Sequence, residues 1–164
     1  MYTILPLTDA DLTACTAIYN HYIEHTCVTL EEAPLTPAEF GDRARRIAAD
    51  YPYLVAKDQS GRVLGYAYLD RFNPRSAYRT TADLSIYVHL DRRAHGVGTA
   101  LLRSICAAAQ EQGIRNLISI ITANNTPSLA FHKKHGFISE GTLHRVAIKF
   151  GQVLDVCYLR LPLE

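Results

Sequence analysis

The 164-residue chain has no tryptophan, one methionine and four cysteines, and neither sign of charge is in large excess. Its 17 lysines and arginines nearly balance its 16 acidic residues, which leaves a formal net charge of +1. Bulk electrostatics therefore give no reason to expect a nucleic-acid or membrane partner. No apolar run approaches the length of a membrane-spanning helix, and the opening residues 1–6 lack the basic and apolar parts of a signal peptide. We expect a cytoplasmic protein.

The cysteines also exclude a common class of site. Cys15, Cys27, Cys106 and Cys157 do not stand at the paired spacings of zinc or redox motifs. Cys106 falls on the apolar side of an expected helix, and Cys157 falls in an apolar, strand-like run. We therefore expect buried, reduced thiols.

What is present fits an ordinary globular protein. The hydrophobic share is 48% and the charged share is 20%, and the length suits one domain with a full core. The chain shows no linker, repeat or low-complexity segment, so residues 1–164 are expected to form a single domain.

Hydrophobic periodicity and turn residues predict an alternation of strands and helices. Thr36-Pro37 and Thr126-Pro127 each place proline at the first helical position after an N-cap threonine, which leaves the Asn125 amide free for a ligand. Strands are expected at 2–7, 53–56, 63–69, 80–88, 117–122, 137–150 and 153–161, and helices at 8–25, 37–50, 96–111 and 126–136. This order favours an α/β fold with a mixed sheet and helices on both faces.

The most informative stretch is Arg92–Leu102, which follows the β-branched run Leu84–Val88 and opens an amphipathic helix. Its glycines let backbone N–H groups approach a phosphate, and the helix N-terminus adds partial positive charge. No Gly-Lys-Ser/Thr follows, so the stretch does not match the phosphate loop of nucleotide triphosphatases. The pattern predicts an anion site.

The spacing Arg93-x-x-Gly96-x-Gly98 resembles the acyl-CoA pyrophosphate loop of the GCN5-related N-acetyltransferases (GNAT). Further blocks fit the same family in order and spacing. They are Asn20–Glu24, Arg75-x-x-Tyr78 with Asp83–Val88, Asn125-Thr126-Pro127-Ser128 with His132 and Gly136-Phe137, Gly141–Leu143, and Asp155-Val156. Together they are similar to the phosphinothricin N-acetyltransferase branch, which includes the acetyltransferases of methionine sulfone and methionine sulfoximine.

The resemblance implies the GNAT fold, a central mixed sheet flanked by about four helices, with acetyl-CoA as co-substrate and no metal. It implies that the backbone of Ile86, Tyr87 and Val88 bonds the acetyl-pantetheine arm, and that Asn125 bonds a pantetheine amide. The Val88 N–H is the natural donor to the oxyanion. The pyrophosphate would be held by the loop residues Arg93, Ala94, His95, Gly96, Val97, Gly98 and Thr99.

Two residues are the candidate catalytic groups by this resemblance. Asp83 occupies the position of the family's catalytic glutamate and is one methylene shorter, which favours action through a water; it is otherwise a solvated strand-end aspartate. His132 stands where many relatives have a tyrosine, and an imidazole can act as acid or base near neutral pH. Its alternative is a surface histidine.

The acceptor is expected to bind near Arg75 and Tyr78, which precede the strand 80–88, with Leu84 and Ser85 as the adjoining wall. An arginine can grip a carboxylate with two parallel hydrogen bonds. Residues 66–83 contain three arginines and two acids, which favours an anionic acceptor such as an amino acid with a second polar head. Phosphinothricin, methionine sulfoximine and methionine sulfone are candidates. Leu30 stands where the family usually has an aromatic residue, so the acceptor pocket is expected to differ here.

Other readings stay open. Acetylation of a protein N-terminus or a polyamine would use the same cofactor loop, and a non-catalytic acyl-CoA-binding module would need the Arg93 loop but neither Asp83 nor His132. His21 and His25 match a short zinc-peptidase pattern without a convincing third ligand, so we expect no metal. Relatives are usually homodimers, and we expect a homodimer here.

Overall fold

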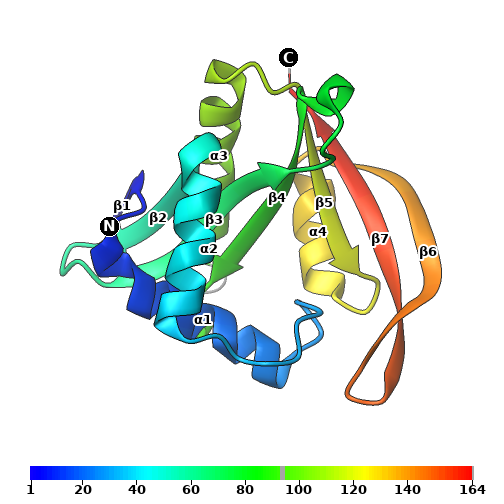
Figure 1. Cartoon of the computed structure of the whole chain (residues 1–164), viewed down its shortest axis with the longest axis horizontal. Coiled ribbons are helices and arrows are strands. Elements are labelled where there is room, and N and C mark those ends of the chain that lie inside the picture. The colour runs from blue at the N-terminus through cyan, green and yellow to red at the C-terminus, as the bar shows by residue number, and fades with distance from the viewer. Residues whose placement is uncertain (93–94, 164) are drawn as a thin grey trace.

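The structure of the chain is a computed structural model that describes residues 1–92 and 95–163 (Figure 1). The described residues form a seven-stranded sheet in the order β1-β2-β3-β4-β5-β7-β6. The strands are β1 Tyr2–Pro6, β2 Tyr53–Asp58, β3 Val63–Arg71, β4 Thr81–Val88, β5 Asn116–Thr122, β6 Ile138–Lys149 and β7 Gln152–Pro162. The helices are α1 Leu12–His25, α2 Pro37–Asp50, α3 Val97–Glu111 and α4 Thr126–Lys134, with 3-10 turns η1 Asp9–Asp11, η2 Ser76–Tyr78 and η3 Leu90–Arg92.

The predicted mixed α/β sheet with helices on both faces is confirmed. β4 pairs with β5 in parallel, whereas the other neighbouring strands pair antiparallel. The predicted first helix divides into η1 and α1, and α4 ends two residues before the predicted boundary at Gly136. Within the described residues, no helix is long and apolar enough to cross a membrane.

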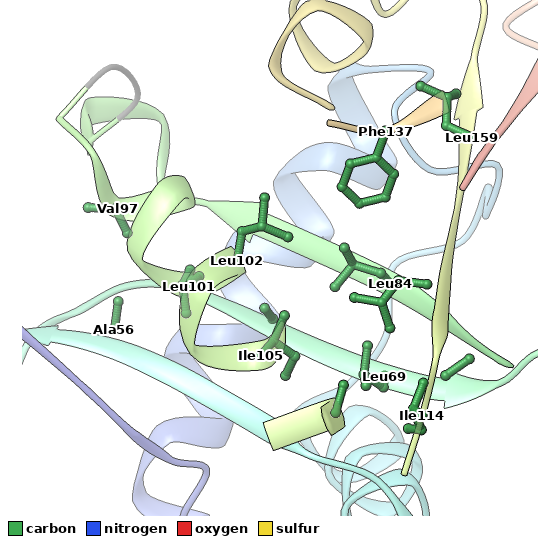
Figure 2. Close-up of a cluster of buried hydrophobic side chains, with 14 of the residues drawn as sticks. Ala56, Leu69, Leu84, Val97, Leu101, Leu102, Ile105, Ile114, Phe137 and Leu159 are labelled. Carbon is green, nitrogen blue, oxygen red and sulfur yellow. The ribbon is translucent and has the colours of Figure 1, made fainter. Parts of the chain in front are cut away.

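Two hydrophobic cores hold the helices against opposite faces of the sheet. On one face, α3 packs Leu101 and Ile105 against the sheet residues Leu69 and Leu84, and α4 adds partly buried side chains to the same core (Figure 2). On the other face, α1 and α2 pack against the sheet through a second, tyrosine-rich core; both helices lie in front of the sheet in Figure 1. Each face of the sheet is therefore covered by its own pair of helices, and only the core under α1 and α2 is rich in tyrosine.

The pairing of β4 with β5 stops early, and this positions the candidate site. Only Thr81–Asp83 pairs with Asn116–Ile118, and beyond these residues the two strands diverge (Figure 1). Leu84–Val88 and Ser119–Thr122 thus form the two sides of a gap in the sheet. β4 leads into η3 and α3 and β5 leads into α4, so both helix N-termini follow the open end of the gap.

Candidate active site

The register of β4 decides which backbone groups face the gap. His89 N–H donates to the Leu64 carbonyl of β3 at 2.8 Å, so the backbone of His89 faces β3. Because the direction alternates along a strand, the polar groups of Val88 and Ile86 face away from β3 and into the gap. The Tyr87 backbone, which we predicted to contact the pantetheine arm as well, faces Tyr66 of β3 instead.

A cleft occupies this gap and brings several predicted residues together. Its walls come from β4, β5, the start of α4 and the connection between α1 and α2. The lining residues are Val28, Leu84, Ser85, Ile86, Tyr87, Ser119, Ile120, Ile121, Asn125, Ser128 and His132. A larger groove, between α1 and the β2–β3 turn, contains none of the predicted catalytic, cofactor-binding or acceptor-binding residues. We place the candidate site in the cleft because Ile86, Asn125 and His132 line it; Asp83, which is next to the lining residue Leu84, is not itself a lining residue.

The N-terminus of α3 offers the backbone donors expected of an anion site. Gly96 is the N-cap, with a φ of 79° that favours glycine. Ala100 N–H is bonded to the Gly96 carbonyl at 3.0 Å, so the N–H groups of Val97, Gly98 and Thr99 precede the first intrahelical bond. These groups and the helix dipole attract an anion. The predicted residues Arg93 and Ala94 lie outside the described residues, and His95 is exposed.

The start of α4 corrects one prediction. The N-cap is Asn125, not Thr126, and its Oδ1 accepts a hydrogen bond from Ser128 N–H at 3.3 Å. Asparagine is a strong N-cap, and Pro127 is tolerated because the first turn does not need its N–H. In the part of the chain described, the side-chain nitrogen of Asn125 has no acceptor, so it can still donate to a ligand.

His132 is 7% exposed, so the surface-histidine alternative is wrong. Its Nδ1 lies 2.8 Å from the Ser128 carbonyl oxygen, and a carbonyl can only accept, so the proton of the neutral ring is on Nδ1. Burial lowers the pKa of His132, and nearby His135 lowers it further. At neutral pH the ring therefore presents an unprotonated Nε2, which accepts a proton or hydrogen bond and does not donate one.

Asp83 is half-buried near the paired end of the gap. Its Oδ1 is buried and, among the residues described, has no hydrogen-bond partner. Burial raises the pKa of Asp83 to about 7, and Asp70, which is opposite it on β3, adds to the shift. This is not a solvated strand-end aspartate. A carboxylate poised near neutral pH can serve as a general base.

The structure separates the predicted acceptor residues. Arg75 and Tyr78 are exposed in the loop that leads into β4, and Tyr78 packs edge-on against Phe72, with ring centroids 5.6 Å apart. Neither residue lines the cleft. Leu84 lines the cleft, but its side chain belongs to the core under α3 (Figure 2), whereas Ser85 alternates onto the face of Asp83.

The connection between α1 and α2, residues 26–36, forms one border of the cleft through Val28. Three tethers fix it to distant elements. Thr122 Oγ1 donates to the Cys27 carbonyl at 2.8 Å, Lys149 Nζ donates to the Thr29 carbonyl at 2.8 Å, and Arg43 pairs with both carboxylate oxygens of Glu31 at 2.6 and 2.8 Å.

Two further contributors to the site were missed from sequence. The Tyr22 hydroxyl of α1 donates to the Val88 carbonyl at 2.6 Å and so fixes the edge of β4 beside the predicted oxyanion donor. Ser119 places a buried hydroxyl in the cleft wall. The sequence gives no functional signal for either residue, because a tyrosine on an apolar helix face and a serine in an apolar strand are both common in the cores of proteins.

Comparison with known proteins identifies the family. The sequence matches the acetyltransferase (GNAT) domain over residues 4–157. The chain belongs to the GNAT acetyltransferases. It is therefore an acetyltransferase, and the family and fold predicted from the motifs are confirmed.

The GNAT chain is 38% identical over 164 residues to phosphinothricin N-acetyltransferase from Alcaligenes faecalis, covering 99% of this chain and 83% of the relative. It is 36% identical over 159 residues to the L-methionine sulfoximine/L-methionine sulfone acetyltransferase of Pseudomonas aeruginosa, covering 94% and 91%. Its structure matches, with a TM-score of 0.94 and 35% identity, the crystal structure of a GNAT superfamily phosphinothricin acetyltransferase from Sinorhizobium meliloti in complex with AcCoA, covering 99% and 88%.

Proposed function

We propose that the chain transfers acetyl from acetyl-CoA to the α-amine of a small amino-acid-like acceptor of the phosphinothricin, methionine sulfoximine or methionine sulfone type. The observation that carries the proposal is the cleft itself. An unpaired edge of β4 leads from the N-terminus of α3 to a carboxyl group, Asp83, with a pKa of about 7. The acceptor class is supported by the relatives, which act on these compounds by name.

Acetyl-CoA fits the groups present. The N–H groups at the start of α3 match its pyrophosphate, and the gap-facing backbone of Ile86 and Val88 matches the pantetheine arm. The side-chain nitrogen of Asn125, which lines the same cleft, matches a pantetheine carbonyl.

Each of these groups has a role in the proposed reaction. Asp83 takes the proton of the acceptor ammonium, directly or through a water, and the free amine attacks the acetyl carbonyl. A gap-facing backbone N–H of β4 stabilises the carbonyl oxygen as it gains charge, an effect typically worth ~3 kcal/mol for one donor. Val88 is five residues from Asp83 along the strand, so the Ile86 N–H is the nearer donor. His132 acts from α4 as a neutral ring that accepts a proton or hydrogen bond. Arg75, exposed in the loop before β4, binds the acidic head of the acceptor.

The proposal includes a homodimer. β6 is an edge strand, and its surface carries large apolar side chains that an isolated protein rarely leaves in water. The exposed members on β6 are Ile138, Leu143, Val146 and Ile148, with Phe150 in the turn that follows and Val153 on β7. Light scattering on the wild type and on Ile148→Glu tests this: we expect a dimer that the charge dissociates, and a wild-type monomer would contradict it.

Release of free CoA from acetyl-CoA, measured with a panel of amines, tests the function. The panel holds phosphinothricin, methionine sulfone, methionine sulfoximine, ordinary amino acids, a polyamine and an N-terminal peptide. We expect turnover with the first three. Turnover only with the polyamine or peptide would support acetyl-CoA as co-substrate and overturn the proposed acceptor class. Acetyl-CoA binding without turnover would favour a non-catalytic binding module.

A further inference from the structure

Two buried oxygens flank the point at which β4 and β5 stop pairing. In the part of the chain that the structure describes, three buried side-chain polar atoms have no hydrogen-bond partner: Tyr66 Oη, Asp83 Oδ1 and Ser119 Oγ. Asp83 forms the last β4–β5 pair with Ile118, and Ser119 is the next residue of β5. Two of the three unpartnered atoms therefore belong to residues at the closed end of the gap.

Asp83 and Ser119 approach this point from opposite faces of the sheet. Residues paired across parallel strands share a face, so Ile118 lies on the face of Asp83 and Ser119 lies on the other. Leu117 and Ile121, which alternate with Ser119, belong to the core under α3. Ser119 thus faces the α3 and α4 side, which also supplies His132 to the cleft.

The buried hydroxyl of Ser119 is unfavourable unless a ligand supplies its hydrogen-bond partner. Ser119 is 2% exposed, and a buried hydroxyl without a partner costs free energy that an alanine would not. Ser119 is a lining residue of the cleft, whereas Tyr66 lies in the tyrosine-rich core on the other face. The cleft is therefore where a partner for Ser119 Oγ would be found.

Resting on the proposed function, we propose that Ser119 is a further catalytic residue, which donates a hydrogen bond to the CoA sulfur as it leaves. The acceptor ammonium first loses one proton to Asp83 or the water on it. The free amine nitrogen then forms the new bond to the acetyl carbon and loses a second proton to solvent as the amide forms. The carbon–sulfur bond breaks, and the electron pair stays on sulfur. Ser119 keeps its own proton, and the thiolate is protonated by solvent after release.

The chemistry of the α4 side favours this donor. His132 has its Nδ1 proton directed to the Ser128 carbonyl, so the neutral ring has none to offer the sulfur. A hydroxyl donates at every pH at which the enzyme works. A free thiol has a pKa of about 8.5, so a hydrogen bond to the thiolate is sufficient help and full protonation is not needed.

Binding of CoA and of desulfo-CoA, which lacks the sulfur, tests the assignment without any acceptor. Calorimetry compares wild type, Ser119→Ala and Ser139→Ala, a matched control on the exposed strand β6, from about pH 6 to about pH 10 across the thiol pKa. We expect Ser119→Ala to lose roughly tenfold in CoA affinity above the thiol pKa and none for desulfo-CoA. Ser119→Cys, which keeps a weak donor, is expected to lie between the two.

The stability and kinetics of Ser119→Ala separate a catalytic role of Ser119 from a structural one, because loss of a structural contact would lower the Tm. Because the hydroxyl has no partner to lose and is costly to bury, Ser119→Ala is expected to keep or raise the wild-type Tm. The kcat is expected to fall about tenfold with an unchanged KM for acetyl-CoA. Equal CoA affinities in wild type and Ser119→Ala at high pH would overturn the Ser119 assignment alone. A wild type that binds neither CoA nor desulfo-CoA would overturn the proposed function and this assignment together.

Discussion

The ammonium of Lys149, which is 1% exposed, donates a hydrogen bond to the carbonyl oxygen of Thr29 at 2.8 Å. This bond joins β6 to the 26–36 segment across 120 residues of sequence. The Thr29 hydroxyl is within 3.0 Å of the Tyr19 hydroxyl of α1. A buried cation thus ties the C-terminal hairpin to the segment that borders the cleft.

Replacing Lys149 with methionine is expected to lower the free energy of unfolding by about 1–3 kcal/mol, because the buried Thr29 carbonyl loses its donor while methionine keeps most of the volume. Loss of this tether is also expected to raise KM for the acceptor more than it lowers kcat. Urea unfolding and steady-state kinetics measure both. The control, Lys133→Met on the exposed face of α4, should match the wild type. Equal stability of the two variants would contradict the prediction.

Asp83→Ala and His132→Ala are each expected to lower kcat by about tenfold or more, within the range typical of acid–base groups. Asp83 offers a carboxylate poised near neutral pH, and His132 offers a buried, neutral ring beside the same cleft. His25→Ala, an exposed histidine on α1, is the control and should keep full activity. Full activity in both test variants would remove the catalytic assignments.

The pH dependence of kcat provides a test of Asp70. Asp83 works as a base only when deprotonated, so activity should rise with pH through its pKa of about 7. Asp70 is the negative charge that helps burial to raise that pKa. Asp70→Asn should therefore lower the pKa of Asp83 and move the rising limb to lower pH. Asp42→Asn, on an exposed residue of α2, should leave the limb in place; an unmoved limb in Asp70→Asn would exclude this coupling.

The starts of the helices could be predicted from sequence because they depend on capping residues and proline within a few positions of each other. Thr36 caps α2 as expected, with its hydroxyl accepting from Glu39 N–H at 3.2 Å and proline in the first turn. At α4 the same reasoning placed the N-cap one residue too late, at Thr126 instead of Asn125, because both residues are good caps and only the folded chain decides between them.

The parts of the site that sequence did not predict depend on contacts between distant residues. Lys149 in a strand pattern reads as an exposed cation, and only the packing of the 26–36 segment buries it. Ser119 reads as one polar position in an apolar strand, and its meaning comes from the early end of β4–β5 pairing. The raised pKa of Asp83 likewise depends on folding: burial is its main cause, and Asp70, thirteen residues away in sequence and directly opposite in the sheet, adds to it.

Gly65 of β3 controls how closely β3 approaches the cleft edge of β4. A Cβ at this position would lie 2.7 Å from the Tyr87 carbonyl oxygen and 3.0 Å from the Val88 Cα. Both are backbone atoms, so a side-chain rotation cannot relieve the contact, and β4 must shift. Gly65→Ala is therefore expected to cost about 1–3 kcal/mol of stability, as overpacking does.

Because the shift falls on Val88, whose N–H faces the gap, Gly65→Ala should also weaken acetyl-CoA binding and lower kcat. Ile47→Val, in the core between α2 and the sheet, is the matched control: it should cost about 0.5–1.5 kcal/mol without touching β4. Urea unfolding measures the loss of stability in each variant, and calorimetry with acetyl-CoA shows whether Gly65→Ala alone also weakens cofactor binding. If the two variants bound acetyl-CoA equally well, the Val88 edge would not be the part of β4 that holds the cofactor.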